Sequence, residues 1–243
     1  MGIPPRLMQL LDPAIARTRN EFDVYESLLK FDGGSVLELG CGKAEHTLNI
    51  AKAHPSAKIT AAEVDRVQHA QNLACIRPNN VTFASFGAES IPLADASNDV
   101  VMLFKSLHHV PVPHLDEALR EIHRVLKPGG HAYISEPVFA GAVNEMIRIF
   151  NDEEAVRKAA FDAVCRAVDT AQFELASETF FLVPVQYKNF AEFDKRHFQV
   201  TYSERNVSDS QRNAVERLFK THLGADGVKL TQPIRIDLLR KPE

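Results

Sequence analysis

Three features are scarce in this 243-residue sequence: cysteine, excess charge of one sign and long hydrophobic runs. Its three cysteines, Cys41, Cys75 and Cys165, lie far apart and form neither a CxxC pair nor a zinc-binding spacing. We therefore expect reduced thiols in a cytoplasmic protein, and no metal ligand set. No apolar run approaches the roughly 20 residues that a membrane span needs, and the N-terminus lacks the pattern of a secretory signal.

The charge balance limits the classes of partner. The formal net charge is −4, so the chain has no overall basic field that would attract nucleic acid or an anionic membrane. A hydrophobic content of 45% and a charged content of 25% are ordinary for a soluble globular protein. The length suits one large domain, or a core domain with an appended lobe.

Short apolar runs alternate with amphipathic segments between positions 35 and 137. Near-continuous apolar strands separated by helices indicate a parallel sheet that is covered on both faces. The clearest helix is expected at 114–126, where apolar residues recur at steps of three and four before Lys127-Pro128-Gly129-Gly130 ends it. The expected strands are 36–39, 58–64, 81–85, 99–104 and 131–135.

The pattern changes after Pro137. One or two helices are expected within 141–173, further helices at 190–198 and 208–223, and strands at 179–187 and 228–242. Before position 35 we expect a helix with Leu7, Leu10, Leu11 and Ile15 on one side.

A glycine loop follows the first expected strand, in the stretch "VLELGCG". Gly40 and Gly42 would allow the backbone to approach a ligand closely, at the sheet edge where such folds bind ligands. Glu63 ends the second strand about 20 residues further on, the place of an acid that hydrogen-bonds a ribose diol. A lone Gly-x-Gly is weak evidence, so the order of the later segments decides the interpretation.

That order is "VLELGCG", then "AAEVD", then "GAESIPLADASNDVVMLFKSLHHV", then "RVLKPGGHAYISEP". As a set, these segments resemble class I, Rossmann-like S-adenosylmethionine-dependent methyltransferases. The closest branch is the small-molecule one that includes the ubiquinone and menaquinone C-methyltransferases. The resemblance covers about residues 35–137.

The resemblance implies an α/β, doubly wound, mostly parallel seven-stranded sheet whose last strand is antiparallel, with a helical lid or insertion. It implies S-adenosyl-L-methionine as cofactor. The cofactor-binding residues that it implies are Glu38, Gly40, Cys41, Gly42, Glu63, Val64, Ala88, Glu89, Phe104, Lys105 and Ser106.

The sequence departs from the family at two positions. Ala44 stands where a third glycine is usual, and Gly87 stands where an acidic residue often accepts the adenine amino group. Either Glu89 takes over that role, or backbone atoms serve alone.

The candidate catalytic residues follow the fourth and fifth strands. His109 and His108 could accept a proton near neutral pH, and Glu136 could orient a methyl acceptor. A structural role is the alternative for each of them. The phenylalanines of 138–205 indicate an aromatic or lipophilic small-molecule acceptor, with ordinary core packing as the alternative.

We divide the chain into an N-terminal helical cap (1–34), a cofactor-binding core (35–137), an acceptor lid (138–205) and a C-terminal helix and strand that complete the sheet (206–243). A methyltransferase acting on RNA or protein, a non-catalytic S-adenosylmethionine-binding module and a nicotinamide-dependent oxidoreductase are the competing functions. The oligomeric state stays open between a monomer and a homodimer.

Overall fold

The computed structural model describes residues 8–12, 14–15, 17–200 and 206–243. One open sheet runs through the molecule in the order β3-β2-β1-β4-β5-β8-β6, with β7 added beside β8. Strands β1 to β5 are parallel, and β8 is antiparallel to both of its neighbours β5 and β6. The predicted Rossmann-like sheet with an antiparallel last strand is confirmed. The strands are β1 (Ser35–Leu39), β2 (Lys58–Ala62), β3 (Val81–Ala84), β4 (Asn98–Phe104), β5 (Leu126–Pro137), β6 (Glu174–Tyr187), β7 (Leu223–Gly224) and β8 (Gly227–Arg240).

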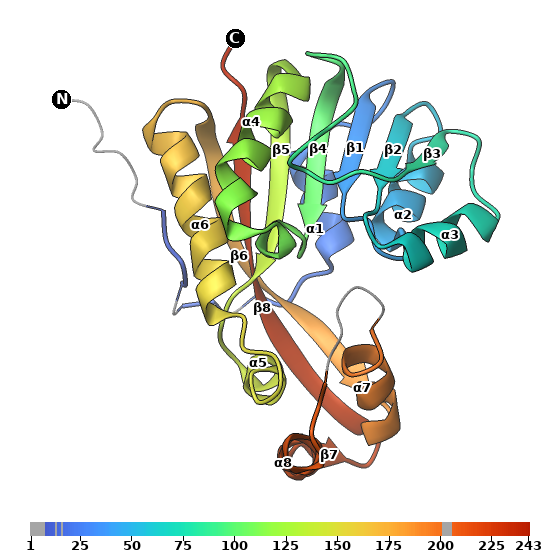
Figure 1. Cartoon of the computed structure of the whole chain (residues 1–243), viewed down its shortest axis with the longest axis vertical. Coiled ribbons are helices and arrows are strands. Elements are labelled where there is room, and N and C mark those ends of the chain that lie inside the picture. Colours follow the sequence, from blue (N-terminus) through green and yellow to red (C-terminus); the bar gives the residue numbers. More distant parts are fainter. Residues whose placement is uncertain (1–7, 13, 16, 201–205) are drawn as a thin grey trace.

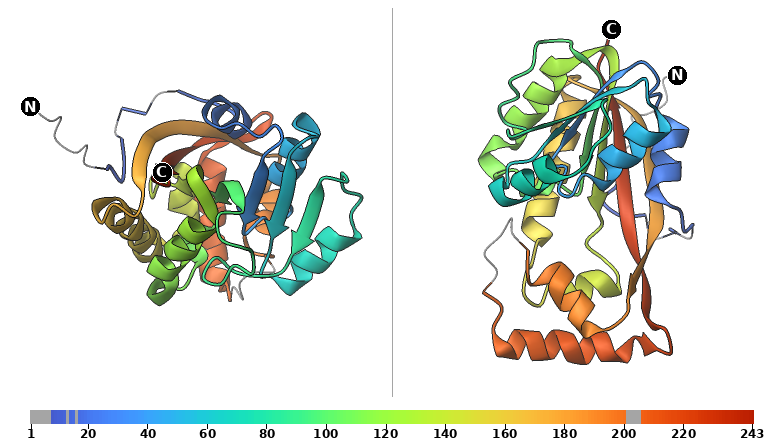
Figure 2. Two further views of the ribbon diagram at one scale, coloured as in Figure 1. Left: turned by 90° about the horizontal axis from the view of Figure 1, so that it is seen from above. Right: turned by 90° about the vertical axis from the view of Figure 1, so that its right-hand side faces the viewer.

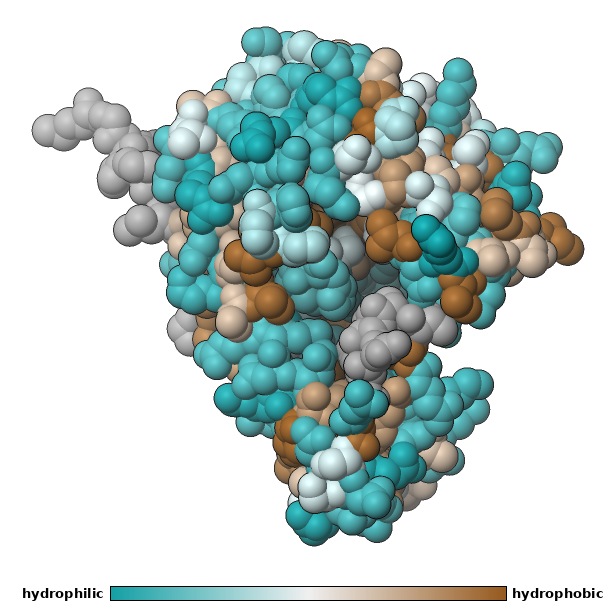
Figure 3. Space-filling model, in the orientation of Figure 1, coloured by the Kyte–Doolittle hydropathy of each residue, from teal (hydrophilic) through white to brown (hydrophobic). Residues whose placement is uncertain are grey.

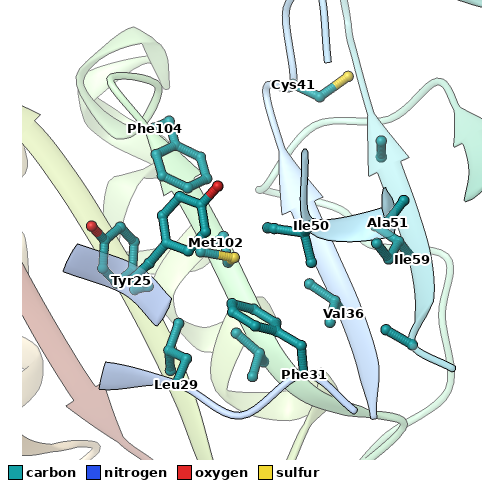
Figure 4. Packing of buried hydrophobic residues seen from close by; sticks show 14 of the residues in the cluster. Tyr25, Leu29, Phe31, Val36, Cys41, Ile50, Ala51, Ile59, Met102 and Phe104 are labelled. Carbon is teal, nitrogen blue, oxygen red and sulfur yellow. The ribbon is translucent and has the colours of Figure 1, made fainter. Parts of the chain in front are cut away.

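Helices cover both faces of this sheet (Figure 1). One apolar cluster joins α1 and α2 to the strands, and a second joins α4 and α6 to the opposite face. Figure 4 shows the first cluster, where Tyr25 from α1 lies near Met102 and Phe104 of β4. The helices are α1 (Glu21–Leu28), α2 (Glu45–Ala53), α3 (Arg66–Ala74), α4 (Leu115–Val125), α5 (Ala142–Ile147), α6 (Glu154–Asp169), α7 (Phe190–His197) and α8 (Asp209–Thr221), with short 3-10 turns η1 (Leu107–His109) and η2 (Val112–His114).

The position of the N-terminal helix was predicted wrongly. Leu10, Leu11 and Ile15 lie outside any helix, and Leu7 falls outside the described residues. The helix begins instead after Asn20, whose side chain accepts a hydrogen bond from the Phe22 N–H (3.0 Å). Asparagine is a strong N-cap, and two acidic residues in the first turn favour a helix start there.

A short bridge precedes that helix. Thr18 pairs in parallel with Leu182 of β6, and the Leu182 N–H donates to the Arg17 carbonyl (2.9 Å). Arg19 N–H donates in turn to the Leu182 carbonyl (3.0 Å), so the N-terminal segment covers part of the edge of the sheet.

A lobe stands below the carboxyl ends of the parallel strands. The arrow of β4 points toward it in Figure 1, and α8 lies across its far end in Figure 2. Its apolar core draws on α5, α7, α8 and the distal halves of β6 and β8. The lobe therefore includes α8 and the start of β8, which lie beyond the 138–205 segment, whereas α6 packs against α4 in the core. A long antiparallel β6–β8 pairing connects the two parts.

Among the described residues, the structure contains no helix that combines the length and the apolar character needed to cross a membrane.

Candidate functional site

The glycine loop makes a tight turn where β1 ends. Gly40 and Gly42 both have positive φ, +69° and +51°. A Cβ added at Gly40 would overlap the Ser106 side chain from the end of β4, so only glycine fits this close approach. The N–H groups of Gly40 and Cys41 donate to the Ala62 carbonyl at the end of β2 (2.9 and 3.0 Å). The loop is thus built against both neighbouring strands.

Glu63 ties the glycine loop to the segment after β2. Its buried carboxylate accepts from the Gly42 N–H (2.7 Å) and from the Asp65 N–H (2.9 Å). A carboxylate offers about four acceptor positions, so two further donors such as a ribose diol can still be accommodated. Val64 beside it is 60% exposed, which leaves an apolar side chain at the edge of the site.

One side chain that the sequence analysis did not single out reinforces the loop. Nδ2 of Asn72, on α3, donates to the Gly42 carbonyl (2.7 Å). Nδ1 of His46 is buried and has no hydrogen-bond partner among the residues that the structure describes, and the His46 ring stacks on Phe104 with centroids 3.8 Å apart. The buried hydroxyls of Tyr25 and Tyr133 likewise lack a partner within the described part of the chain, and both rings contact Phe104.

The structure explains both departures from the family motif, at Ala44 and at Gly87. Ala44 takes a left-handed conformation with φ 59°, which explains why glycine suits this position. A Cβ added at Gly87 would overlap the carboxylate of Glu89, so the Glu89 carboxylate occupies the space of a residue-87 side chain. Ala88 between them is buried.

Glu38 and Cys41 are buried next to the loop. Glu38 accepts a hydrogen bond from the Thr47 hydroxyl of α2, and burial raises the pKa of its carboxyl to about 7. Burial also raises the pKa of the Cys41 thiol, which makes it a poor nucleophile at neutral pH.

The segment after β4 folds back toward β5. Lys105 has a positive φ of 55°, and its N–H donates to the Ser135 carbonyl (2.7 Å). Ser106 Oγ donates to the Leu39 carbonyl (2.8 Å), which fastens the end of β4 to the start of the glycine loop. The turn then brings η1 over Glu136, at the end of β5.

Glu136 is the centre of a buried polar network. Its Oε1 accepts from the Leu107 N–H (3.0 Å), and its Oε2 is hydrogen-bonded to Nδ1 of His108. Burial by itself would raise the pKa of Glu136, but the charge and hydrogen bond of His108 outweigh it and hold that pKa below its usual range. His108 is buried, whereas the adjacent His109 ring is exposed, with the two ring centroids 4.1 Å apart.

The segment before α6 completes this network, and no sequence motif pointed to it. Nε2 of His108 faces Oε2 of Glu153 at 3.8 Å. Arg157 Nη2 donates to the same Glu153 oxygen (2.6 Å), and its Nη1 donates to Oδ1 of the buried Asn144 (3.2 Å).

A cavity of about 160 Å³ opens beside Glu136. Apolar side chains from the N-terminal segment and from the end of β5 line it, together with Arg157, Lys158 and Arg235. Figure 3 shows the surface hollowed between core and lobe. Of the phenylalanines in 138–205, Phe139 reaches this cavity, whereas several others pack inside the lobe core.

Comparisons with known proteins agree with this architecture. Residues 36–130 match the family model described as a methyltransferase domain. The methyltransferase GfsG of Streptomyces halstedii is 31% identical over 56% of this chain and 50% of its own length. A ubiquinone/menaquinone biosynthesis C-methyltransferase of Hahella chejuensis is 31% identical over 52% of each chain. The 27-O-demethylrifamycin SV methyltransferase of Amycolatopsis mediterranei is 32% identical over 43% of this chain and 39% of its own. The chain thus spans about half the length, or less, of these curated relatives.

Solved structures show the same fold over most of the chain. The YcgJ protein of Bacillus subtilis superposes with a TM-score of 0.63 at 18% identity, covering 91% of this chain and 98% of its own. The [4+2]-cyclase SpnF superposes with a TM-score of 0.58 at 22% identity, covering 91% and 80%.

The burial of Glu38 predicts a pH-dependent stability. Its pKa is about 7 in the folded chain against an ordinary value of 4.5, so the folded state retains a proton that the unfolded state releases. The stabilising contribution of this carboxyl is complete below pH 4.5 and is lost as the pH rises to about 7. We expect the free energy of unfolding of Glu38→Gln to rise relative to that of wild type by on the order of 2–3 kcal/mol between pH 4.5 and 7. Urea unfolding at several pH values measures it.

The exposed Glu145 provides the matched control, Glu145→Gln, which should follow the wild-type pH profile. If Glu38→Gln also follows that profile between pH 4.5 and 7, the assignment of the raised pKa to Glu38 is wrong.

Proposed function

We propose that the chain transfers the methyl group of S-adenosylmethionine to a small-molecule acceptor. The match of residues 36–130 to a methyltransferase domain supports this proposal. The methyl donor is a sulfonium already activated by its charge, so the protein mainly aligns donor and acceptor for in-line displacement and excludes water.

The observation that carries the proposal is that the glycine loop and the polar network around Glu136 lie next to each other at one edge of the sheet. Ser106 is hydrogen-bonded to Leu39, where the glycine loop begins. Two residues further along the chain, His108 is hydrogen-bonded to Glu136. A cofactor lying on the glycine loop would therefore face the polar network after β4. His109 is the exposed member of this network and the proposed proton acceptor, whereas His108 and Glu136 position it.

We assign the cofactor contacts as the family motif implies. Gly40, Cys41 and Gly42 would pass beside the methionine and ribose, with Glu38 behind the loop and Glu63 accepting from the ribose diol. Val64, Ala88 and Glu89 would surround the adenine, and Phe104, Lys105 and Ser106 would lie near the methionine. The exposure of Val64 supports its role, and the hydrogen bond that the Glu63 carboxylate accepts from the Gly42 N–H supports that of Glu63.

We propose an acceptor with an aromatic or lipophilic body. Phe139, Val138, Leu10 and Leu11 line the cavity beside Glu136, which supports an apolar ligand. Two of the relatives are named after ubiquinone/menaquinone and after rifamycin, which also supports a small molecule of this kind.

A cytoplasmic location fits the thiols, since Cys41, Cys75 and Cys165 are all free.

The Glu89 carboxylate offers a sharp test of adenine recognition. We expect Glu89→Ala to weaken S-adenosylmethionine binding about tenfold, because a hydrogen bond to a charged acceptor contributes roughly 1.5 kcal/mol or more. In the double variant Gly87→Asp/Glu89→Ala, the new carboxylate enters the space that Glu89 vacates, so affinity should return toward the wild-type value. Calorimetry measures the three affinities.

Gly87→Asp alone should weaken binding, since its side chain would overlap that of Glu89. Equal affinities in wild type and Glu89→Ala would remove Glu89 from the adenine site.

Methyl transfer itself is tested with cofactor tritiated on the methyl group and a small-metabolite extract. We expect radioactivity in an organic-extractable small molecule, and a rate reduced at least tenfold in His109→Ala with unchanged cofactor affinity. The exposed His114→Ala is the matched histidine control and should retain the wild-type rate.

Radioactivity confined to protein or RNA would replace the small-molecule proposal by the macromolecular one. Binding of the cofactor without any transfer would favour a binding module, or other chemistry of the kind that the name of the cyclase SpnF indicates for that protein.

A further inference from the structure

Three side chains with metal-binding atoms meet at the carboxyl edge of the sheet, apart from the glycine loop. One ring nitrogen each of His108 and His109 and one carboxylate oxygen of Glu153 lie within 4.8 Å of one another. The two histidines come from η1 and the glutamate from the segment before α6, so tertiary folding alone brings the set together.

The spacing between His108 and Glu153 is the decisive observation. Nδ1 of His108 is hydrogen-bonded to the Glu136 carboxylate, which can only accept, so this nitrogen carries the proton. A metal ion that binds His108 would displace the proton on Nε2, and the lone pair exposed in this way faces Oε2 of Glu153, 3.8 Å away. Two acceptors facing each other repel unless a positive charge lies between them.

A proton does not fill this gap well, because an N–H···O hydrogen bond spans about 2.7–3.2 Å. A cation does: two ligand atoms that each bind a metal at about 2.0–2.2 Å lie roughly 3–4 Å apart. The spacing of 3.8 Å is therefore that of two ligands sharing one ion.

The surroundings orient these ligands as outer-shell partners do in metalloproteins. A carboxylate on the far nitrogen of a ligating histidine fixes its tautomer and raises its basicity, and Glu136 occupies that place. Asn151 Nδ2 donates to Oε1 of Glu153 (2.7 Å) and Arg157 Nη2 to Oε2 (2.6 Å).

The local charge also leaves room for a cation. Glu136 and Glu153 contribute two negative charges. Arg157 pairs with Glu153, and Arg235, which also acts on Glu136, pairs with a third carboxylate, that of Asp237.

We propose that His108, His109 and Glu153 bind a divalent transition-metal cation at the acceptor side of the sheet edge. Two imidazoles and one carboxylate suit ions such as Zn²⁺, Co²⁺ or Fe²⁺ better than Mg²⁺, which prefers oxygen ligands alone. Three protein ligands leave coordination positions open for a small molecule, on the exposed side of His109. The site does not depend on the methyl-transfer proposal, because binding of the ion is measured directly. A His109 nitrogen that binds the ion cannot accept a proton, so the proton-acceptor role of His109 applies to the chain without the ion.

Zinc titration of the full chain after treatment with a chelator tests the proposal by calorimetry. We expect one Zn²⁺ per chain, and no comparable heat with Mg²⁺. His109→Ala and Glu153→Gln should each lower zinc affinity at least tenfold, since each removes a ligand. Glu136→Gln should lower it by about 10- to 100-fold through the orientation of His108. His114→Ala, an exposed histidine beside the exposed Glu117, should bind zinc like wild type.

Binding of S-adenosylhomocysteine is measured on the same samples to check folding, and it should stay unchanged in His109→Ala and Glu153→Gln. If Glu153→Gln misfolds and binds neither zinc nor S-adenosylhomocysteine, His109→Ala decides the question, because His109 is exposed and its replacement should leave the fold intact. The proposal is wrong if wild type binds no zinc, or if a folded His109→Ala binds it as tightly as wild type does.

Discussion

The carboxylate of Glu63 is the constraint on which the candidate cofactor site depends. By accepting from Gly42 and Asp65 it joins the loop after β1 to the loop after β2, and Asn72 adds a third tie from α3. A turn with two left-handed glycines would otherwise be free to take several conformations. These hydrogen bonds select one of them before any ligand arrives, so binding need not supply the cost of ordering the loop.

A second constraint acts across the same edge. Glu136 accepts from the backbone and the ring of the segment after β4, which fixes η1 over the end of β5. Ser106 connects this segment to the glycine loop. Parallel strands end at a common edge, and the lobe carried by β6 and β8 stands below it, so the glycine loop and the polar network lie at the same edge of the sheet.

Much of the core could be predicted from sequence, because its signals are local. The strands β1 and β4 are near-continuous apolar runs, and the apolar residues of α4 repeat at helical spacing. The N-terminal helix was misplaced because the prediction used the spacing of apolar residues alone and did not consider Asn20, which caps the helix. Glu153, Arg157 and Asn72 belong to no sequence motif. Their contacts with the site form only when segments that are distant in the sequence pack together. The roles of the site residues stay predictions.

The account is tested most directly by calorimetry of S-adenosylhomocysteine and NAD with wild type and Glu63→Ala, alongside Glu117→Ala as an exposed-carboxylate control. We expect wild type and the control to bind the first ligand and not NAD. Glu63→Ala should lose at least about tenfold in affinity, because both a charged hydrogen-bond acceptor and the tie to Gly42 are removed. Binding of NAD by wild type, or an unchanged affinity in Glu63→Ala, would contradict the account.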